Sequence, residues 1–163
     1  MRRWVYSDDV GPLASAGLLL LRLVMGTAFL LHGWPKIQHP LDWMGLEATV
    51  PPALQCAAAW AEFGGGSLLI LGLLTRLGAL GILANMIVAL ALVHVPAGQP
   101  FVGRPGEPSF ELPAVYLTCA LLLLLAGAGQ FSFDALLFGR GAGRPAVGPG
   151  AFGPGTVPGG APR

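Results

Sequence analysis

The chain has 163 residues, of which 54% are hydrophobic and 10% charged, and its formal net charge is +1. A charged fraction this far below the roughly 25% of soluble domains excludes an ordinary soluble protein. The near-neutral charge, with no basic patch that carries interleaved aromatic residues, gives no reason to expect nucleic-acid binding. The composition therefore predicts an all-α integral membrane protein.

Four apolar segments are long enough to cross a bilayer, which takes about 20 residues of helix. Helices are expected because backbone polar groups cannot remain unpaired in lipid. The first segment is too long for a signal-peptide core and no small-residue cleavage site follows it, so we interpret it as a retained span. A further segment at 131–138 is too short to cross and is expected at the interface. The four predicted spans are residues 13–34, 53–74, 77–95 and 112–129.

The distribution of lysine and arginine predicts the orientation. The turn that contains Arg76 and the two terminal segments hold most of these residues, whereas loops 35–52 and 96–111 hold only Lys36 and Arg104. Because cytoplasmic segments are enriched in Lys and Arg, both termini are expected to be cytoplasmic.

The composition also divides the chain into three parts. Residues 1–12 form a short cytoplasmic segment, and residues 13–138 form the four-helix membrane domain. Residues 139–163 are mostly glycine and proline and cannot bury enough apolar surface to order themselves, so we expect disorder there. Cys56 and Cys119 have neither metal-binding nor redox spacing and are expected to pack as small apolar residues.

Arg22 lies inside the apolar run "LLLLRLVMGT" and needs a partner, because burying its charge in hydrocarbon is costly. Glu62 lies near the middle of the next, antiparallel span, and the two backbones differ in depth by roughly 4–5 Å at 1.5 Å per residue. We therefore expect an Arg22–Glu62 pair, which Asn85 of the third span could join. This polar layer could serve proton or ligand handling, or it could only fix the register of the helices.

Helical periodicity places small residues beside these polar groups, a pattern that lets membrane helices approach closely. The stripe on the first span is Ser15, Arg22, Gly26, Phe29 and Gly33, and the stripe on the second is Gln55, Ala58, Glu62, Gly66 and Leu69.

A second set of polar residues is expected at the outer interface: His32, Lys36, His94 and Glu111. Each has a structural explanation, because histidine tolerates the membrane boundary, lysine extends to water and glutamate suits a helix N-terminus. Together they could also bind the headgroup of a quinone-like molecule in an apolar pocket, with His32 and His94 as candidate catalytic residues that exchange protons. No ligand spacing supports a metal site.

Three stretches resemble the DoxX family of membrane proteins. The first is the Arg–x3–Gly–x2–Phe–x2–His-Gly–x2–Lys pattern at 22–36, and the second is the Glu–x2–Gly-Gly–x5–Leu-Gly-Leu–x-Thr-Arg pattern at 62–76. The third is the looser ending at 127–134, where the family usually has leucine in place of Phe133. The resemblance covers about residues 16–138. It implies that the motif residues Arg22, His32, Lys36, Glu62, Arg76 and His94 are the functional ones.

The resemblance further implies a four-helix protein of the bacterial inner membrane, similar to the DoxD quinone-reducing subunit of thiosulfate:quinone oxidoreductase. Some relatives are described as partners of redox and detoxification enzymes. The chain has no flavin, haem or nucleotide motif, so electron transfer would need a bound quinone or a partner protein.

Three functions stay open at this point. The first is a redox-associated subunit that binds a quinone-like molecule. The second is a non-catalytic membrane anchor or assembly factor for a redox or detoxification enzyme. The third is a carrier of protons or a small solute through the layer of Arg22, Glu62 and Asn85. The sequence does not decide whether the protein is catalytic, nor does it specify an oligomeric state.

Overall fold

The structure is a computed structural model that describes residues 10–45 and 47–139; the predicted disorder from residue 140 onward lies outside these ranges. Every regular element in the described part of the chain is helical, which confirms the predicted all-α class. The elements are α2 (Pro12–Gln38), α3 (Pro52–Leu71), α4 (Thr75–Ala89), the π-helical turn η1 (Leu90–His94), α5 (Glu111–Ala126) and α6 (Phe133–Phe138).

The helices form a membrane bundle. Among the described residues, α2, α3 and the continuous run of α4 with η1 are long and apolar enough to span a bilayer. The fourth apolar helix, α5, has 16 residues, which corresponds to about 24 Å at 1.5 Å per residue. Many large apolar side chains on the outside of the bundle are exposed, as expected for surfaces that face lipid.

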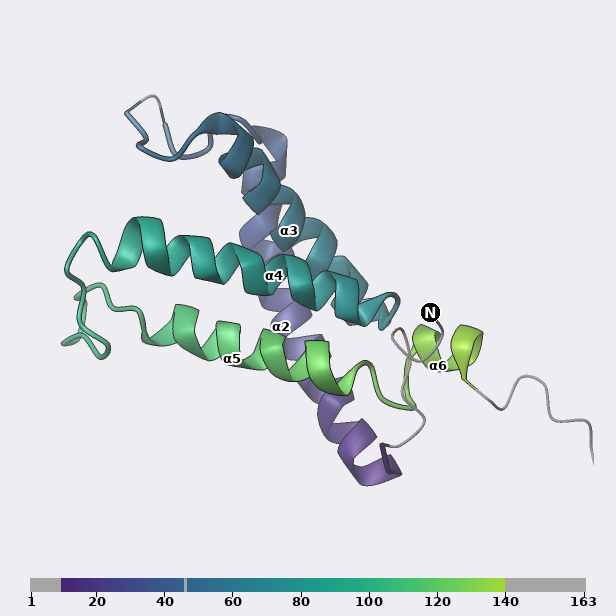
Figure 1. Cartoon of the computed structure of the whole chain (residues 1–163). Helices are drawn as coiled ribbons and strands as arrows, with labels where there is room; N and C mark the ends of the chain where they lie inside the picture. Colours follow the sequence, from purple (N-terminus) through teal and green to yellow (C-terminus); the bar gives the residue numbers. More distant parts are fainter. Residues whose placement is uncertain (1–9, 46, 140–163) are drawn as a thin grey trace, which may run out of the picture.

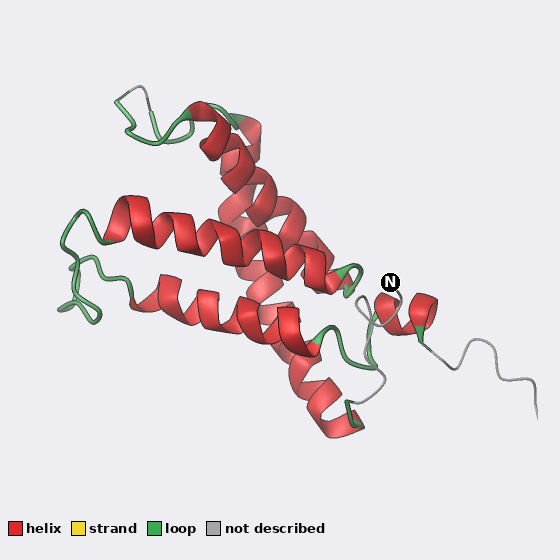
Figure 2. Ribbon diagram, viewed as in Figure 1, coloured by secondary structure: helices red, strands yellow, loops and turns green. Residues whose placement is uncertain are grey.

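The bundle consists of two helix pairs that cross each other (Figures 1 and 2). Helices α2 and α3 pack side by side, and α4 and α5 form a second pair that lies across them. The loops after α2 and after η1 lie toward one side in Figure 1, whereas the α3–α4 turn and α6 lie toward the other. This arrangement agrees with the predicted placement of loops 35–52 and 96–111 on one side of the membrane.

The α2–α3 pair depends on glycine at the points of closest approach. A Cβ on Gly26 would lie 2.8 Å from the carbonyl oxygen of Gly66, and one on Gly33 would lie 2.8 Å from the Cα of Phe63. Gly26 and Gly33 of the stripe predicted for the first span therefore face α3. All five residues of the stripe are buried: Ser15, Arg22, Gly26, Phe29 and Gly33.

The predicted end of the first span at Trp34 was wrong, because α2 continues through Pro35 to Gln38. Proline in the last turn of a helix removes one hydrogen bond and leaves few residues beyond it to be displaced, so the helix can continue. Lys36 consequently lies on the helix, three residues after Gly33, and not in a loop. This places its side chain toward the bundle.

Candidate functional site

Three polar side chains from three helices meet inside the bundle. Lys36 Nζ lies 2.6 Å from Glu62 Oε1, and Asn85 Nδ2 donates a hydrogen bond of 2.9 Å to the same oxygen. The side chain of Glu62 is 5% exposed, and Lys36 Nζ also lies 4.3 Å from the centre of the Trp43 ring. The buried carboxylate is thus compensated by a cation and an amide, as a charge in a low-dielectric interior requires. We call Lys36, Glu62 and Asn85 the polar triad.

The predicted Arg22–Glu62 pair was wrong, although Asn85 does join Glu62 as expected. Arg22 is fully buried and donates from Nη1 to the Leu69 carbonyl oxygen at 3.2 Å and from Nη2 to the Phe131 carbonyl oxygen. The Leu69 carbonyl is among the last four of α3, which lack helical partners and lie at the negative end of the helix dipole. Backbone oxygens therefore bind Arg22, and the carboxylate of Asp134 adds a favourable charge interaction. Lys36 occupies the position beside Glu62 that was predicted for Arg22.

The segment after α5 returns to the α3–α4 turn and fixes its geometry. Buried Asp134 accepts hydrogen bonds from the backbone N–H groups of Leu74 at 2.7 Å and Thr75 at 2.9 Å, while its own N–H donates to the Gly72 carbonyl at 2.8 Å. Leu74 has a left-handed backbone, with φ of 46°, at the N-terminus of α4. Asp134 thus serves as the N-terminal cap of a helix to which it does not belong.

Arg76 lies at the same end of the bundle. Its Nη2 donates a hydrogen bond of 3.0 Å to the Leu125 carbonyl, close to the C-terminus of α5. The motif residues Arg22 and Arg76 therefore both contact carbonyl oxygens at helix ends, and both hold the bundle together at the side opposite the long loops.

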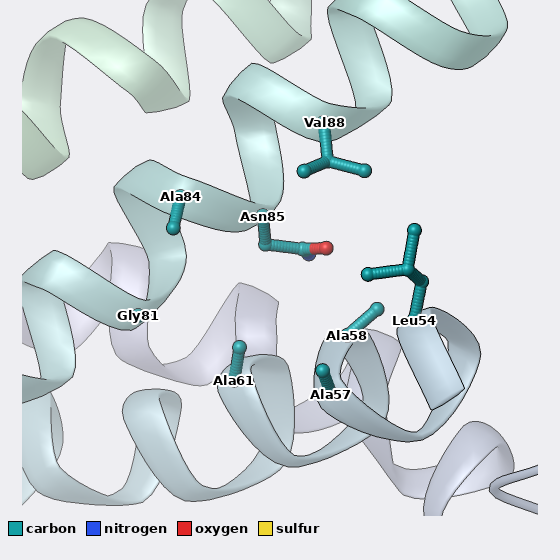
Figure 3. Close-up of a pocket in the computed structure, with 8 residues that line it drawn as sticks. All are labelled: Leu54, Ala57, Ala58, Ala61, Gly81, Ala84, Asn85 and Val88. Atoms are coloured by element: carbon teal, nitrogen blue, oxygen red, sulfur yellow. The ribbon is translucent and has the colours of Figure 1, made fainter.

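A groove of about 310 Å³ lies between α3 and α4 (Figure 3). A smaller hollow of about 90 Å³ shares part of its lining and extends to Lys36, Trp43 and Glu62. Figure 3 shows Asn85 of α4 directed into the space above the small side chains of α3. The groove is lined by Leu54, Ala57, Ala58, Ala61, Gly81, Ala84, Asn85 and Val88.

Of the four predicted ligand-binding residues, Lys36 lines the smaller hollow and the other three line neither one. His32 is exposed on α2 and Glu111 is exposed in the first turn of α5. His94 Nδ1 lies 2.7 Å from Gln99 Oε1 at the end of η1. Within residues 10–45 and 47–139, no three His, Cys, Asp or Glu side chains are placed to share a metal ion.

Sequence reasoning named Ala58, Gly81 and Asn85 as residues beside the polar layer, but it missed Ala57, Ala61 and Ala84 and did not predict a groove. Ala57 and Ala61 are one helical turn apart on α3, as are Gly81 and Asn85 on α4, so their spacing was visible in the sequence. Such spacing does not distinguish a tightly packed interface from a hollow, because that depends on how closely the two helices approach.

Comparison with known proteins places the chain among bacterial membrane proteins. Residues 17–95 match the family model described as DoxX. An uncharacterized protein of Haemophilus influenzae is 33% identical, over 74% of this chain and 90% of that protein. A protein of Bacillus subtilis named "Putative oxidoreductase CatD" is 29% identical, over 75% of this chain and 87% of that protein. The "Inner membrane protein YqjF" of Escherichia coli is 29% identical, over 77% of this chain and 95% of that protein.

No solved structure shows a significant match to this chain. Taken with the apolar helices, the sequence matches confirm the predicted location, a multi-pass protein of the bacterial inner membrane.

Proposed function

Since this chain belongs to the DoxX family of membrane proteins, we propose that it is the membrane subunit of a redox system and binds a quinone-like lipid between α3 and α4. The observation that supports this proposal is the groove itself, whose walls are small and apolar and whose adjoining hollow ends at the polar triad. Lipophilic ligands with a polar ring need this combination of apolar walls and a few polar groups. The printed name of the Bacillus subtilis relative also points to redox chemistry.

The groove has room for the ring and the first part of an apolar tail. Its volume of about 310 Å³ is at the lower end of the roughly 300–1,000 Å³ of typical ligand sites. Ala57 and Ala84 on its two walls are exposed on the outside of the bundle, so the remainder of a tail can extend among lipid chains. A ligand of this kind enters from the bilayer and never crosses water.

Electron transfer in this proposal requires a partner enzyme, because the chain carries no motif for a redox centre of its own. Proton exchange is assigned to the histidines named from the sequence. His94 follows directly on Val93, which lines the smaller hollow, whereas His32 lies exposed on α2. Histidine suits this task because a ring nitrogen can both accept and release a proton.

The test is a measurement of bound quinone. The protein is purified in mild detergent and its extracted lipids are analysed by mass spectrometry, beside Gly81→Leu and Gly17→Leu variants. A Cβ on Gly81 makes only an ordinary contact, 3.7 Å from the Cβ of Ala61, so leucine there fills the groove. Gly17 is exposed on α2 with nothing within 4 Å of an added Cβ, so the same leucine leaves the groove unchanged.

Stoichiometric quinone in the wild type and in Gly17→Leu, and its loss in folded Gly81→Leu, would support the proposal. Absence of quinone from every preparation would contradict it and would favour the second candidate, a non-catalytic anchor for a redox enzyme.

One observation favours that second candidate. A further hollow of about 280 Å³ shares Ala61 and Gly81 with the groove and continues along α3 and α4 past Gly64 and Gly78. A long surface of small residues suits the docking of a partner's transmembrane helix. If the protein is an anchor, the Gly64→Leu variant should form a smaller complex on native gels. A Cβ added at position 64 would have no atom within 4 Å. Gly17→Leu should leave that size unchanged.

A further inference from the structure

We propose that the loop between α2 and α3 is part of the ligand site, with Trp43 in contact with the quinone ring and Gln55 holding Trp43 in place. This inference rests on the proposed function, to which it adds one residue that contacts the ligand and one positioning residue. We call residues 39–51, which join the two helices, the outer loop.

Residues from both ends of the outer loop line the smaller hollow. They are Trp43, Met44 and Val50. Val50 is buried and Trp43 is half-buried, and the centre of the Trp43 ring lies 4.3 Å from Lys36 Nζ. The outer loop therefore supplies part of the wall directly beside the polar triad, whose three residues line the same hollow.

The buried side chain of Gln55 joins the two ends of the outer loop. Its Oε1 accepts a hydrogen bond of 3.1 Å from the backbone N–H of Met44, and its Nε2 donates one of 2.9 Å to the Val50 carbonyl oxygen. The backbone carbonyl of Gln55 accepts a third bond, of 2.9 Å, from Trp43 Nε1. Gln55 itself lines neither the groove nor the smaller hollow, so it acts on a ligand only through the outer loop.

Trp43 offers a ligand the surface of its ring. Its single N–H group is donated to Gln55, and indole has no other hydrogen-bonding group. The smaller hollow has a volume of only about 90 Å³ and shares Leu54 and Ala58 with the groove. A quinone whose polar edge reaches from the groove into this hollow therefore contacts the Trp43 ring. Such contacts are favourable when aromatic rings stack with an offset or meet edge to face.

Tryptophan fluorescence tests the contact, because an electron-poor quinone ring quenches excited indole when the two rings touch. One variant keeps only Trp43 and carries phenylalanine in place of Trp4, Trp34 and Trp60. The matched variant keeps only Trp34, which is 58% exposed near the end of α2 and lines neither the groove nor the smaller hollow. Both are titrated with decyl-benzoquinone in mild detergent. We expect saturable quenching of Trp43, and only a weak, linear loss of Trp34 emission from free quinone in the micelle.

Gln55→Leu tests the positioning role, since it keeps a side chain of similar size and removes the bonds to Met44 and Val50. Equilibrium dialysis should show decyl-benzoquinone binding about three- to tenfold more weakly, the change expected for one aromatic contact. In a Trp43→Leu background the same change should weaken binding no further, because Gln55 acts through Trp43. Gln38→Leu, at an exposed position of α2, is the control and should leave binding unchanged.

The two proposals fail in different ways. Binding by dialysis without saturable quenching of Trp43, or with equal quenching of Trp43 and Trp34, would overturn the inference and leave quinone binding intact. An equal effect of Gln55→Leu with and without Trp43 would also overturn it. The fluorescence titration needs no change at Gln55, so it decides the matter even if Gln55→Leu fails to fold. Absence of decyl-benzoquinone binding by dialysis would overturn both proposals.

Discussion

Lys36 Nζ lies 2.6 Å from Glu62 Oε1 in the interior of an apolar helix bundle. The pair bridges α2 and α3 one turn beyond Gly33, where the two backbones come into contact. Close approach of the helices therefore places the cation and the carboxylate together, and the low dielectric around them makes each dependent on the other.

Removing only the cation should destabilise the protein. We predict that Lys36→Met lowers the free energy of unfolding by about 3–5 kcal/mol, because it leaves the Glu62 carboxylate buried without a counter-charge. The double variant Lys36→Met/Glu62→Gln should recover most of this loss. Thermal unfolding in detergent measures both effects. Arg104→Met, which removes an exposed cation, is the control and should melt like the wild type.

Gly72 is expected to tolerate no side chain. Its φ is 64°, a conformation that costs other residues roughly 1–2 kcal/mol, and an added Cβ would overlap Nη1 of Arg22. Gly72→Ala should therefore reduce the free energy of unfolding by more than about 2 kcal/mol. Gly17→Ala should instead raise the free energy of unfolding by about 0.5–1 kcal/mol, because position 17 lies within a helix and has open space for a Cβ. Similar melting of the two variants would contradict this account of Gly72.

Asp134 should control the start of α4. Asp134→Ala removes both acceptors from the Leu74 and Thr75 amides and should cost about 2–3 kcal/mol of stability. Asp134→Asn retains one acceptor oxygen and should cost less. Hydrogen exchange at the Leu74 and Thr75 amides is the specific measurement, and it should accelerate in both variants. Asp42→Ala, at an exposed position, provides the control; unchanged exchange in Asp134→Ala would rule out the capping role.

The orientation can be tested by labelling single cysteines. In a Cys56→Ala/Cys119→Ala background, cysteine replaces exposed Ala97 in the loop after η1, or exposed Leu137 in α6. With both termini in the cytoplasm, a membrane-impermeant maleimide should label position 97 in intact spheroplasts and position 137 only after lysis. Labelling of position 137 in intact spheroplasts would reverse the assignment.

The sequence predicts the bundle well, because burial in a membrane is governed by long apolar runs and by a 3.6-residue period. Both signals are local, and they placed Gly26 and Gly33 on the face that contacts α3 and Phe29 on a buried face. The end of α2 was harder to predict from the sequence, because a proline usually breaks a helix and Pro35 does not. Had the period been extended by one turn, Lys36 would have fallen on the same face as Gly33.

The partner of Arg22 could not be read from local pattern. The carbonyl of Phe131 is 109 residues away in the chain and belongs to a short return segment with no helical period of its own. A backbone oxygen also leaves no trace in the sequence, because every residue has one. Pairing Arg22 with Glu62 was therefore consistent with the depths of the two residues, but the hydrogen-bond partners are backbone oxygens and the carboxylate that acts on Arg22 is Asp134.

The position of Phe131 and Asp134 after all four long helices also determines when the fold can be completed. During synthesis Arg22 enters the membrane with the first helix, gains the Leu69 carbonyl when α3 is made, and gains the Phe131 carbonyl only after α5 has been inserted. Asp134 likewise caps α4 only once the last described helix begins. Until then the nascent protein carries an incompletely compensated cation and an uncapped helix, which are the features that membrane quality-control proteases would encounter in chains that stall before this segment.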